Sequence, residues 1–247
     1  RTSLGKSVID DFLKKDKTKM LYLSGTPFNL YEDFKEDEIY TWDYIAEQQA
    51  KKKWYEEHPN EKNPYEELPK MNIFTYDITK NINNVLDQTG IFTFPEFFRT
   101  WTGNPKADNP KSDKKAIPMP VGAKGRFVHE AEVLKFLCTK DAENNFPFST
   151  TEYRKMFRHT LWVVSHVNEA AALEQLLNEH PTFRHFNVVN VAGKNDTDEQ
   201  SENALDKVLN AIGELPEKTS TITISCGRLT TGVTVAPWTA VFYLKGG

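Results

Sequence analysis

The sequence has few of the residues that build metal centres, and it lacks long apolar runs. Only two cysteines are present, Cys138 and Cys226, and neither forms a metal-spaced cluster with any of the six histidines. We therefore expect no metal site and in particular no structural zinc. No apolar run approaches the roughly 20 residues that cross a bilayer, and no signal-peptide pattern opens the chain. These absences favour a soluble, cytoplasmic protein that does not enter a membrane.

Two catalytic signatures are also missing. No GxxxxGK[ST] loop, which would hold nucleotide phosphates, occurs anywhere in the chain. Ser165 and His166 are adjacent, but no GxSxG turn and no suitably spaced carboxylate accompany them. A hydrolase built on a Ser-His pair is therefore not expected.

The charge is unevenly distributed along the 247 residues. The whole chain carries a net charge of −4, yet residues 31–67 hold 12 acidic and 5 basic side chains, whereas residues 99–126 hold 7 basic and 2 acidic ones. Nucleic-acid binding follows the local field, so the acidic total does not exclude it. A hydrophobic content of 38% is typical of a globular protein with a sizeable core.

Strand and helix patterns alternate from Thr160 onward, which predicts an α/β fold with a parallel sheet. The expected strands are Leu161–Ser165, Phe186–Val191, Thr221–Ser225 and Ala240–Leu244, and the expected helices are Asn168–Asn178, with Asn168 as a possible N-cap, and Thr197–Ile212. The first part is less regular. Its expected strands are Met20–Ser24 and Met71–Tyr76, and its expected helices are Thr41–Glu57 and Phe94–Trp101. Thr102–Gly125 reads as an extended basic loop or linker, followed by a helix whose apolar stripe is Phe127, Ala131, Leu134 and Cys138.

Small polar residues gather where three of the strands end. Ser24, Gly25 and Thr26 follow the first one, and Ser165 and His166 follow another. The richest group follows Ile224: Ser225, Gly227, Arg228, Thr230, Gly232 and Thr234. Parallel sheets present backbone N–H groups and small hydroxyls to phosphates at such ends. The alternatives are ordinary turns, a surface or capping histidine, and a plain loop whose arginine forms a surface ion pair.

Taken in order, these motifs resemble the motor of superfamily 2 helicases, and more narrowly the Res-type helicase subunit of Type III restriction enzymes and related restriction endonucleases. Ser24–Phe28 is similar to motif III, Thr160–Leu177 to motif IV and Gly227–Val235 to motif V. The resemblance implies RecA-like parallel sheets of the P-loop NTPase type, with ATP and Mg²⁺ as cofactors and DNA as partner. It also implies a methyltransferase subunit as a possible further partner.

The same resemblance implies roles for individual residues. Ser24, Gly25 and Thr26 would couple ATP hydrolysis to DNA movement, and Gly232 and Thr234 would face the nucleotide. The DNA-backbone contacts would be Ser165, His166, Ser225, Gly227, Arg228 and Thr230.

Several parts of such a motor are absent from this sequence. Besides the phosphate-binding loop, no DEAH-like acidic strand precedes Ser24, and motif VI would lie beyond Gly247. We therefore expect an internal segment of a motor that does not hydrolyse ATP alone. Its expected parts are the end of a first lobe (1–30), an inserted acidic and aromatic region with a basic Pro-rich linker (31–125), and most of a second lobe (126–247).

Two other functions remain open. In the first, a non-catalytic DNA-binding module grips phosphates through the basic loop Lys106–Arg126 and through Ser225–Arg228. In the second, the acidic region Tyr31–Glu67 docks a partner subunit such as a methyltransferase.

Overall fold

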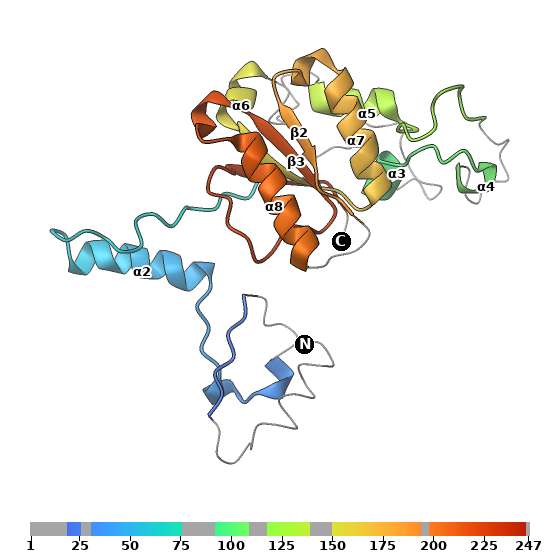
Figure 1. Ribbon diagram of the computed structural model, residues 1–247. Helices are drawn as coiled ribbons and strands as arrows, with labels where there is room; N and C mark the ends of the chain where they lie inside the picture. Colours follow the sequence, from blue (N-terminus) through green and yellow to red (C-terminus); the bar gives the residue numbers. More distant parts are fainter. Residues whose placement is uncertain are drawn as a thin grey trace. The chain divides into compact units, whose positions relative to one another are not determined.

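The computed structural model describes residues 19–25, 31–75, 92–108, 118–138, 150–193 and 198–245. The chain divides into two compact units, Arg1–Ile73 and Phe74–Gly247 (Figure 1). The first unit contains α2, and the second contains the sheet and the helices from α3 to α8.

The described part of the first unit is built around α2, Tyr44–Glu57, which follows the short 3-10 helices η2, Tyr31–Asp33, and η3, Glu36–Glu38. Asp43 caps α2 by accepting the Ala46 N–H at 2.8 Å. The chain then returns along the helix, where the Lys51 amine donates to the carbonyls of residues 66 and 68 at 2.9 and 3.0 Å. The helix expected at Thr41–Glu57 is therefore confirmed, three residues shorter at its start.

The two strands expected in the first part of the chain are wrong. Residues 20–24 and 71–75 form no strand, and Tyr76 lies outside the described residues. The side chains of Leu21, Leu23 and Ile73 are 85%, 86% and 79% exposed. An apolar run becomes a strand only where a neighbouring strand takes up its backbone hydrogen bonds. In the part of the chain that the structure describes, neither run is paired in a sheet.

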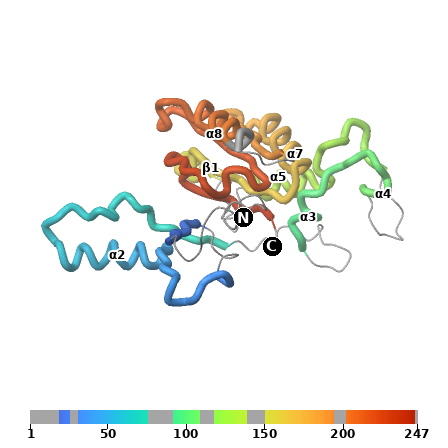
Figure 2. The backbone as a smooth tube through the Cα atoms, turned by 60° about the horizontal axis from the view of Figure 1, so that its bottom comes forward, coloured from blue at the N-terminus to red at the C-terminus, as the bar shows by residue number. Residues whose placement is uncertain are grey.

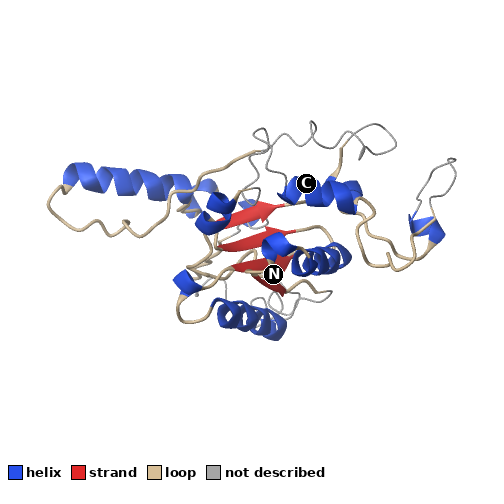
Figure 3. Cartoon of the chain, turned by 90° about the horizontal axis from the view of Figure 1, so that it is seen from above, coloured by secondary structure: helices blue, strands red, loops and turns tan. Residues whose placement is uncertain are grey.

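The second unit contains a sheet of four parallel strands (Figure 3). The strands are β1, His159–Val163; β2, Asn187–Asn190; β3, Thr221–Ser225; and β4, Ala240–Tyr243. Their spatial order is β2-β3-β1-β4, so β1 and β3 form the centre. The α/β class, the parallel sheet and all four strands are confirmed, with β3 matching the expected residues at both ends.

Helices pack against both faces of this sheet. α7, Val167–Glu179, joins β1 to β2 by way of η6, Pro181–Phe183, and α8, Asp198–Ile212, leads with η7, Pro216–Lys218, into β3. The short α6, Thr151–Met156, precedes β1. On one face α7 packs against Trp162, Ile222 and Ile224, and these residues form one core. On the other face α8 joins a second core, made of Val191, Ala204, Val208, Ile212, Leu229 and Val235.

The segment at 92–138 belongs to the first of these cores. It contains α3, Phe94–Phe97; α4, Pro105–Asp108; and α5, Glu130–Cys138. The aromatic residues that it buries in this core are Phe97, Phe98, Phe127 and Phe136. A bridge between Thr100 and Phe127 ties its two halves together, and Figure 2 shows α5 beside α7.

This segment departs from expectation in two ways. Within Thr102–Gly125 the described residues form α4 and hydrogen-bonded turns rather than an extended linker. The helix after it begins at Glu130 and buries Val133, Phe136 and Leu137. Of the expected apolar stripe, Phe127 is buried in the core, and Leu134 and Cys138 are half-buried against it, whereas Ala131 is exposed. The expected stripe is therefore confirmed in part, and the apolar face of the helix is wider than expected.

Candidate functional site

The carboxyl edge of the sheet brings two of the predicted sites together. β1 and β3 are neighbours, Val163 pairs with Ser225, and the Val164 N–H donates to the Ser225 carbonyl at 2.9 Å. After β1 the chain enters α7 on one face of the sheet, whereas the loop after β3 contributes Leu229 to the core on the other face. Open parallel sheets bind ligands where neighbouring connections diverge in this way. Ser165 and His166 therefore lie at the same edge as Gly227 and Arg228.

The loop after β3 is held by its own hydroxyl groups. Ser225 is fully buried, and its Oγ donates to the Arg228 carbonyl at 2.6 Å while accepting the Gly227 N–H at 3.1 Å. Thr230 Oγ1 donates to the Gly227 carbonyl at 2.6 Å. These bonds make a compact Ser/Thr turn. The Ser225 hydroxyl thus acts inside the protein, and its expected contact with a phosphate stays a prediction.

Backbone strain marks the middle of this loop. Leu229 has φ of 60°, a left-handed conformation that is uncommon for a branched residue, and its side chain is 5% exposed. Burial of this side chain in the core beside α8 compensates for the cost of that backbone conformation.

Further along the loop, Gly232 has φ of 75° and room for a Cβ, so the backbone angle rather than crowding favours glycine there. Gly232 and Thr234 are exposed, and their role toward a nucleotide stays a prediction.

The end of β1 is occupied by a carboxylate of the chain itself. Glu169 accepts the backbone N–H groups of Ser165 at 2.8 Å and of His166 at 3.1 Å. Burial raises the pKa of Glu169, against the lowering effect of these two hydrogen bonds. The groups left for a ligand are the half-buried Ser165 hydroxyl and the exposed His166 ring. Because His166 is the N-cap of α7, the expected cap at Asn168 is wrong.

Arg228 turns toward the end of β2. Its Nη1 donates to the Val191 carbonyl at 3.3 Å, and its guanidinium lies directly against Gly193. A groove of about 340 Å³ opens beside it, lined by Asn190, Val191, Ala192, Asn203, Ala204, Lys207 and Arg228. Among these residues, only Arg228 was predicted from the sequence to take part in a site. The sequence does contain a signal for this groove. The small residues Ala192 and Gly193 directly follow an expected strand, as small residues do at the other predicted sites.

The coupling residues belong to the first unit. Ser24 and Gly25 lie in irregular, exposed chain, and Thr26 lies outside the described residues. Their expected role stays a prediction.

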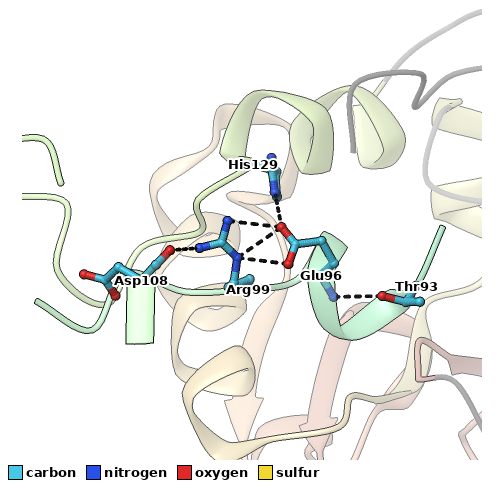
Figure 4. A network of polar contacts seen from close by, with 5 residues as sticks. All are labelled: Thr93, Glu96, Arg99, Asp108 and His129. Carbon is cyan, nitrogen blue, oxygen red and sulfur yellow. Dashed lines mark hydrogen bonds and ion pairs between the residues drawn. The ribbon is translucent and has the colours of Figure 1, made fainter. Parts of the chain in front are cut away.

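Two arginines of the basic segment are engaged in internal contacts. Arg99 Nε donates to Glu96 at 3.1 Å, its Nη1 donates to the Asp108 carbonyl, and His129 meets Glu96 at 3.0 Å (Figure 4). Burial would raise the pKa of Glu96, but the hydrogen bonds from His129 and Arg99 together hold it below its usual value. Arg126 Nη2 forms ion pairs with the carboxylates of Glu130 and Glu179, at 2.7 and 2.9 Å.

These ion pairs weaken the case for the basic loop as a DNA-binding arm. Arg99 and Arg126 contribute to the positive charge of residues 99–126, yet both neutralise carboxylates of the same unit. The described lysines Lys106 and Lys124 are exposed. The loop therefore presents less free charge than its composition suggests.

Two further properties concern metals and membranes. Among the described residues no three His, Cys, Asp or Glu side chains gather as a metal site would require. In the same residues no helix has the length and apolar character that a bilayer span needs.

Comparison with known proteins gives one informative relative. A Mycoplasma pneumoniae protein, provisionally named as the C-terminus of a type II restriction enzyme and methyltransferase, is 28% identical over 247 aligned positions. The alignment covers 92% of this chain and 32% of the relative, so the chain spans about a third of that protein's length. No family profile and no solved structure matches the chain. The chain is thus related in sequence to a protein named for a restriction system.

Proposed function

We propose that this chain is part of an ATP-dependent DNA translocase motor of a restriction system, and that residues 126–247 form most of its second RecA-like lobe. One observation carries the proposal: the loops after β1 and β3 lie together at the carboxyl edge of a parallel sheet. They are the segments that resemble motifs IV and V. The restriction enzyme in the relative's name supports the biological setting.

The proposed role of this chain within the motor is to contact DNA and nucleotide. The hydroxyls of Ser165 and Thr230, the exposed His166 ring and the Arg228 guanidinium would meet the DNA backbone. Gly232 and Thr234 would face the nucleotide. The methyltransferase in the relative's name supports a modification enzyme as a partner of the motor.

The residues of this sequence do not fit a magnesium–ATP centre. The sequence has no GxxxxGK[ST] loop to hold the phosphates and no DEAH-like acidic strand before Ser24 to hold the metal. No step of hydrolysis is therefore assigned to this chain, and we expect the 247 residues alone to be inactive.

The test is DNA-stimulated ATP hydrolysis by the protein at its full natural length. We expect duplex DNA to stimulate hydrolysis and Arg228→Ala to reduce that stimulation about tenfold or more, as loss of one charge-assisted contact would. Thr26→Ala should also reduce the stimulation, because Thr26 is a proposed coupling residue. Arg184→Ala, an exposed arginine that precedes the amino end of β2, is the matched control and should leave the rate unchanged. Hydrolysis that DNA does not stimulate, or no hydrolysis at all, would contradict the motor.

A further inference from the structure

The start of α2 carries three exposed apolar side chains, which together form the apolar patch. Tyr40, Trp42 and Ile45 are 83%, 48% and 63% exposed. Tyr40 and Trp42 are two residues apart, a spacing that favours the same side of a non-helical stretch, and Ile45 lies in the first turn of α2. Single exposed apolar side chains are common on protein surfaces, whereas a group of them marks an interaction site. We propose that the apolar patch docks a protein partner whose binding pocket is apolar at its centre and basic at its rim.

The patch is exposed because hydrogen bonds hold α2 to the chain that follows it, which runs back beside the helix (Figure 2). Asn63 is buried there, and its Nδ2 donates to the Lys51 carbonyl at 2.9 Å. The Tyr44 hydroxyl accepts the Met71 N–H at 2.8 Å. α2 itself has no buried residue. Polar groups therefore make these contacts, and the apolar side chains at the start of the helix remain exposed.

Trp42 is held in position although it is half-exposed. Its ring lies against that of Tyr65, with the centroids 6.0 Å apart and the planes inclined by 35°. The Tyr65 N–H donates in turn to Asn63 Oδ1 at 2.9 Å. A side chain that is already positioned loses less conformational freedom when a partner binds. Tryptophan and tyrosine are also the residue types that most often dominate the energetics of an interface.

The charge around the patch selects the class of partner. Residues 36–50 hold no basic side chain and five acidic ones, Glu36, Asp37, Glu38, Asp43 and Glu47. Such a surface repels DNA, so nucleic acid does not fit it. Interfaces have an apolar centre and a polar rim, and the rims of two partners carry complementary charge. The fitting surface is therefore an apolar pocket surrounded by lysine and arginine side chains.

The modification enzyme of the same restriction system is the partner that meets this requirement. An enzyme that methylates DNA carries basic surface, because it has to neutralise phosphates, and such a region can supply the rim. The inference rests on the proposed function, which gives the motor a methyltransferase as partner. It deepens that function by assigning the contact to three side chains of the first unit.

The experiment measures the affinity of the 247-residue chain for the purified modification methyltransferase by isothermal titration calorimetry. We expect Trp42→Ala to raise the Kd about 10-fold or more and Ile45→Ala to raise it about 3- to 10-fold, as truncation of central interface residues does. Ile45→Ala is the sharper variant, because alanine has the highest helix propensity and α2 therefore stays helical. Leu215→Ala, at an exposed leucine of the second unit, is the matched control and should change the Kd less than about twofold.

Asp37→Lys tests the charged rim, since Asp37 is exposed in η3. We expect it to raise the Kd about 3-fold or more and to weaken the dependence of affinity on salt, because salt screens the attraction between exposed charges. Glu214→Lys, at an exposed glutamate of the second unit, should leave the affinity and its salt dependence unchanged. An affinity that Asp37→Lys leaves unchanged would overturn the basic rim.

Three results would overturn the proposed partner. The first is a wild-type chain that does not bind the methyltransferase. The second is binding that neither Trp42→Ala nor Ile45→Ala weakens. The third is a dimer of the chain, seen by sedimentation velocity, that Ile45→Ala dissociates, since it would assign the apolar patch to a second copy.

Failure of the proposed function gives a different result. Ile45→Ala should leave DNA-stimulated ATP hydrolysis by the full-length protein unchanged, because Ile45 belongs to none of the segments that resemble motifs III, IV and V. If DNA does not stimulate hydrolysis but the two patch variants weaken methyltransferase binding, the motor fails and the docking role of the patch stands. If DNA stimulates hydrolysis but neither variant changes binding, the motor stands and the docking role fails.

Discussion

At the scale of single residues, the loop after β3 combines a strained backbone with a buried side chain. Leu229 alone among the described non-glycine residues has positive φ, and it also helps to form the core beside α8. These two properties oppose each other energetically. A left-handed backbone costs a non-glycine residue about 1–2 kcal/mol, whereas burying a leucine side chain contributes about 1.5–3 kcal/mol.

This opposition gives a prediction for substitutions at Leu229. Leu229→Ala should destabilise the protein by about 2–5 kcal/mol through loss of core packing. Leu229→Gly loses the same packing but relieves the strain, so we expect it to be at least as stable as Leu229→Ala. Elsewhere glycine is less stable than alanine by about 0.5–1 kcal/mol. Urea unfolding of the two variants measures the difference.

Val235 supplies the matched control because it lies in the same core but has no positive φ. There the glycine variant should be the less stable of the pair. If Leu229→Gly also proved less stable than Leu229→Ala by about 1 kcal/mol, the strain at Leu229 would not be significant.

At the scale of elements, the start of α7 depends on a buried carboxylate. Glu169 accepts N–H groups from Ser165 and His166, which satisfies donors that would otherwise be unpaired. Burial raises the pKa of Glu169 above that of an unfolded glutamate. A raised pKa means that its contribution to stability is fully present below the unfolded pKa of about 4.3 and is lost as the pH rises through the folded pKa.

The prediction concerns the pH dependence of Glu169→Gln. Glutamine keeps an acceptor for both N–H groups but carries no charge to bury. We therefore expect the stability of this variant relative to wild type to increase as the pH rises from about 4 toward 7. Urea unfolding across that range measures it. A relative stability that falls over this range would mean that the ionised carboxylate is stabilising, and the inferred direction of the pKa shift would be wrong.

Asp108 provides a control of opposite sign. Burial would raise its pKa, but hydrogen bonds from the Thr102 hydroxyl and from the backbone of Thr102 and Gly103 outweigh burial and lower it. Its contribution is therefore present above the unfolded pKa of about 3.9 and is lost as the pH falls through the folded pKa. The free energy of unfolding of Asp108→Asn should consequently fall further below that of wild type at neutral pH than at acidic pH.

Sequence patterns predicted the elements better than the contacts between them. β3 was placed to the residue because five consecutive strand-type residues end at a serine–glycine turn, and α7 was placed to within one residue at each end. The Glu169 cap was missed, although glutamate three residues after an N-cap is a sequence signal. The Gly193–Arg228 contact could not be predicted, because it joins two loops that only the strand order β2-β3 brings together. The apolar run at residues 20–24 gave a wrong strand prediction, because a strand needs neighbouring strands and the local sequence does not specify them.

At the scale of the whole molecule, hydrophobic burial is concentrated in the second unit. Both cores consist of residues between Phe92 and Leu244. In the first unit α2 has no buried residue, and among the described residues only Asn63 falls in the buried class. Since burial of apolar surface is the main source of folding free energy, the two units should differ greatly in stability.

We therefore predict that residues 74–247, produced alone, unfold cooperatively in urea with a midpoint within about 0.3 M of the transition seen in the whole chain. Two-state unfolding midpoints report stability divided by the surface exposed, and this unit retains both cores. Residues 1–73 produced alone should show no cooperative transition, because a helix without a buried face is marginal in water. Circular dichroism and tryptophan fluorescence follow both fragments; Trp162 is fully buried and reports on the sheet. A midpoint lowered by more than about 1 M in the isolated second unit would mean that the first unit contributes substantially to its folding, and the carboxyl edge would then have to be studied in the intact chain.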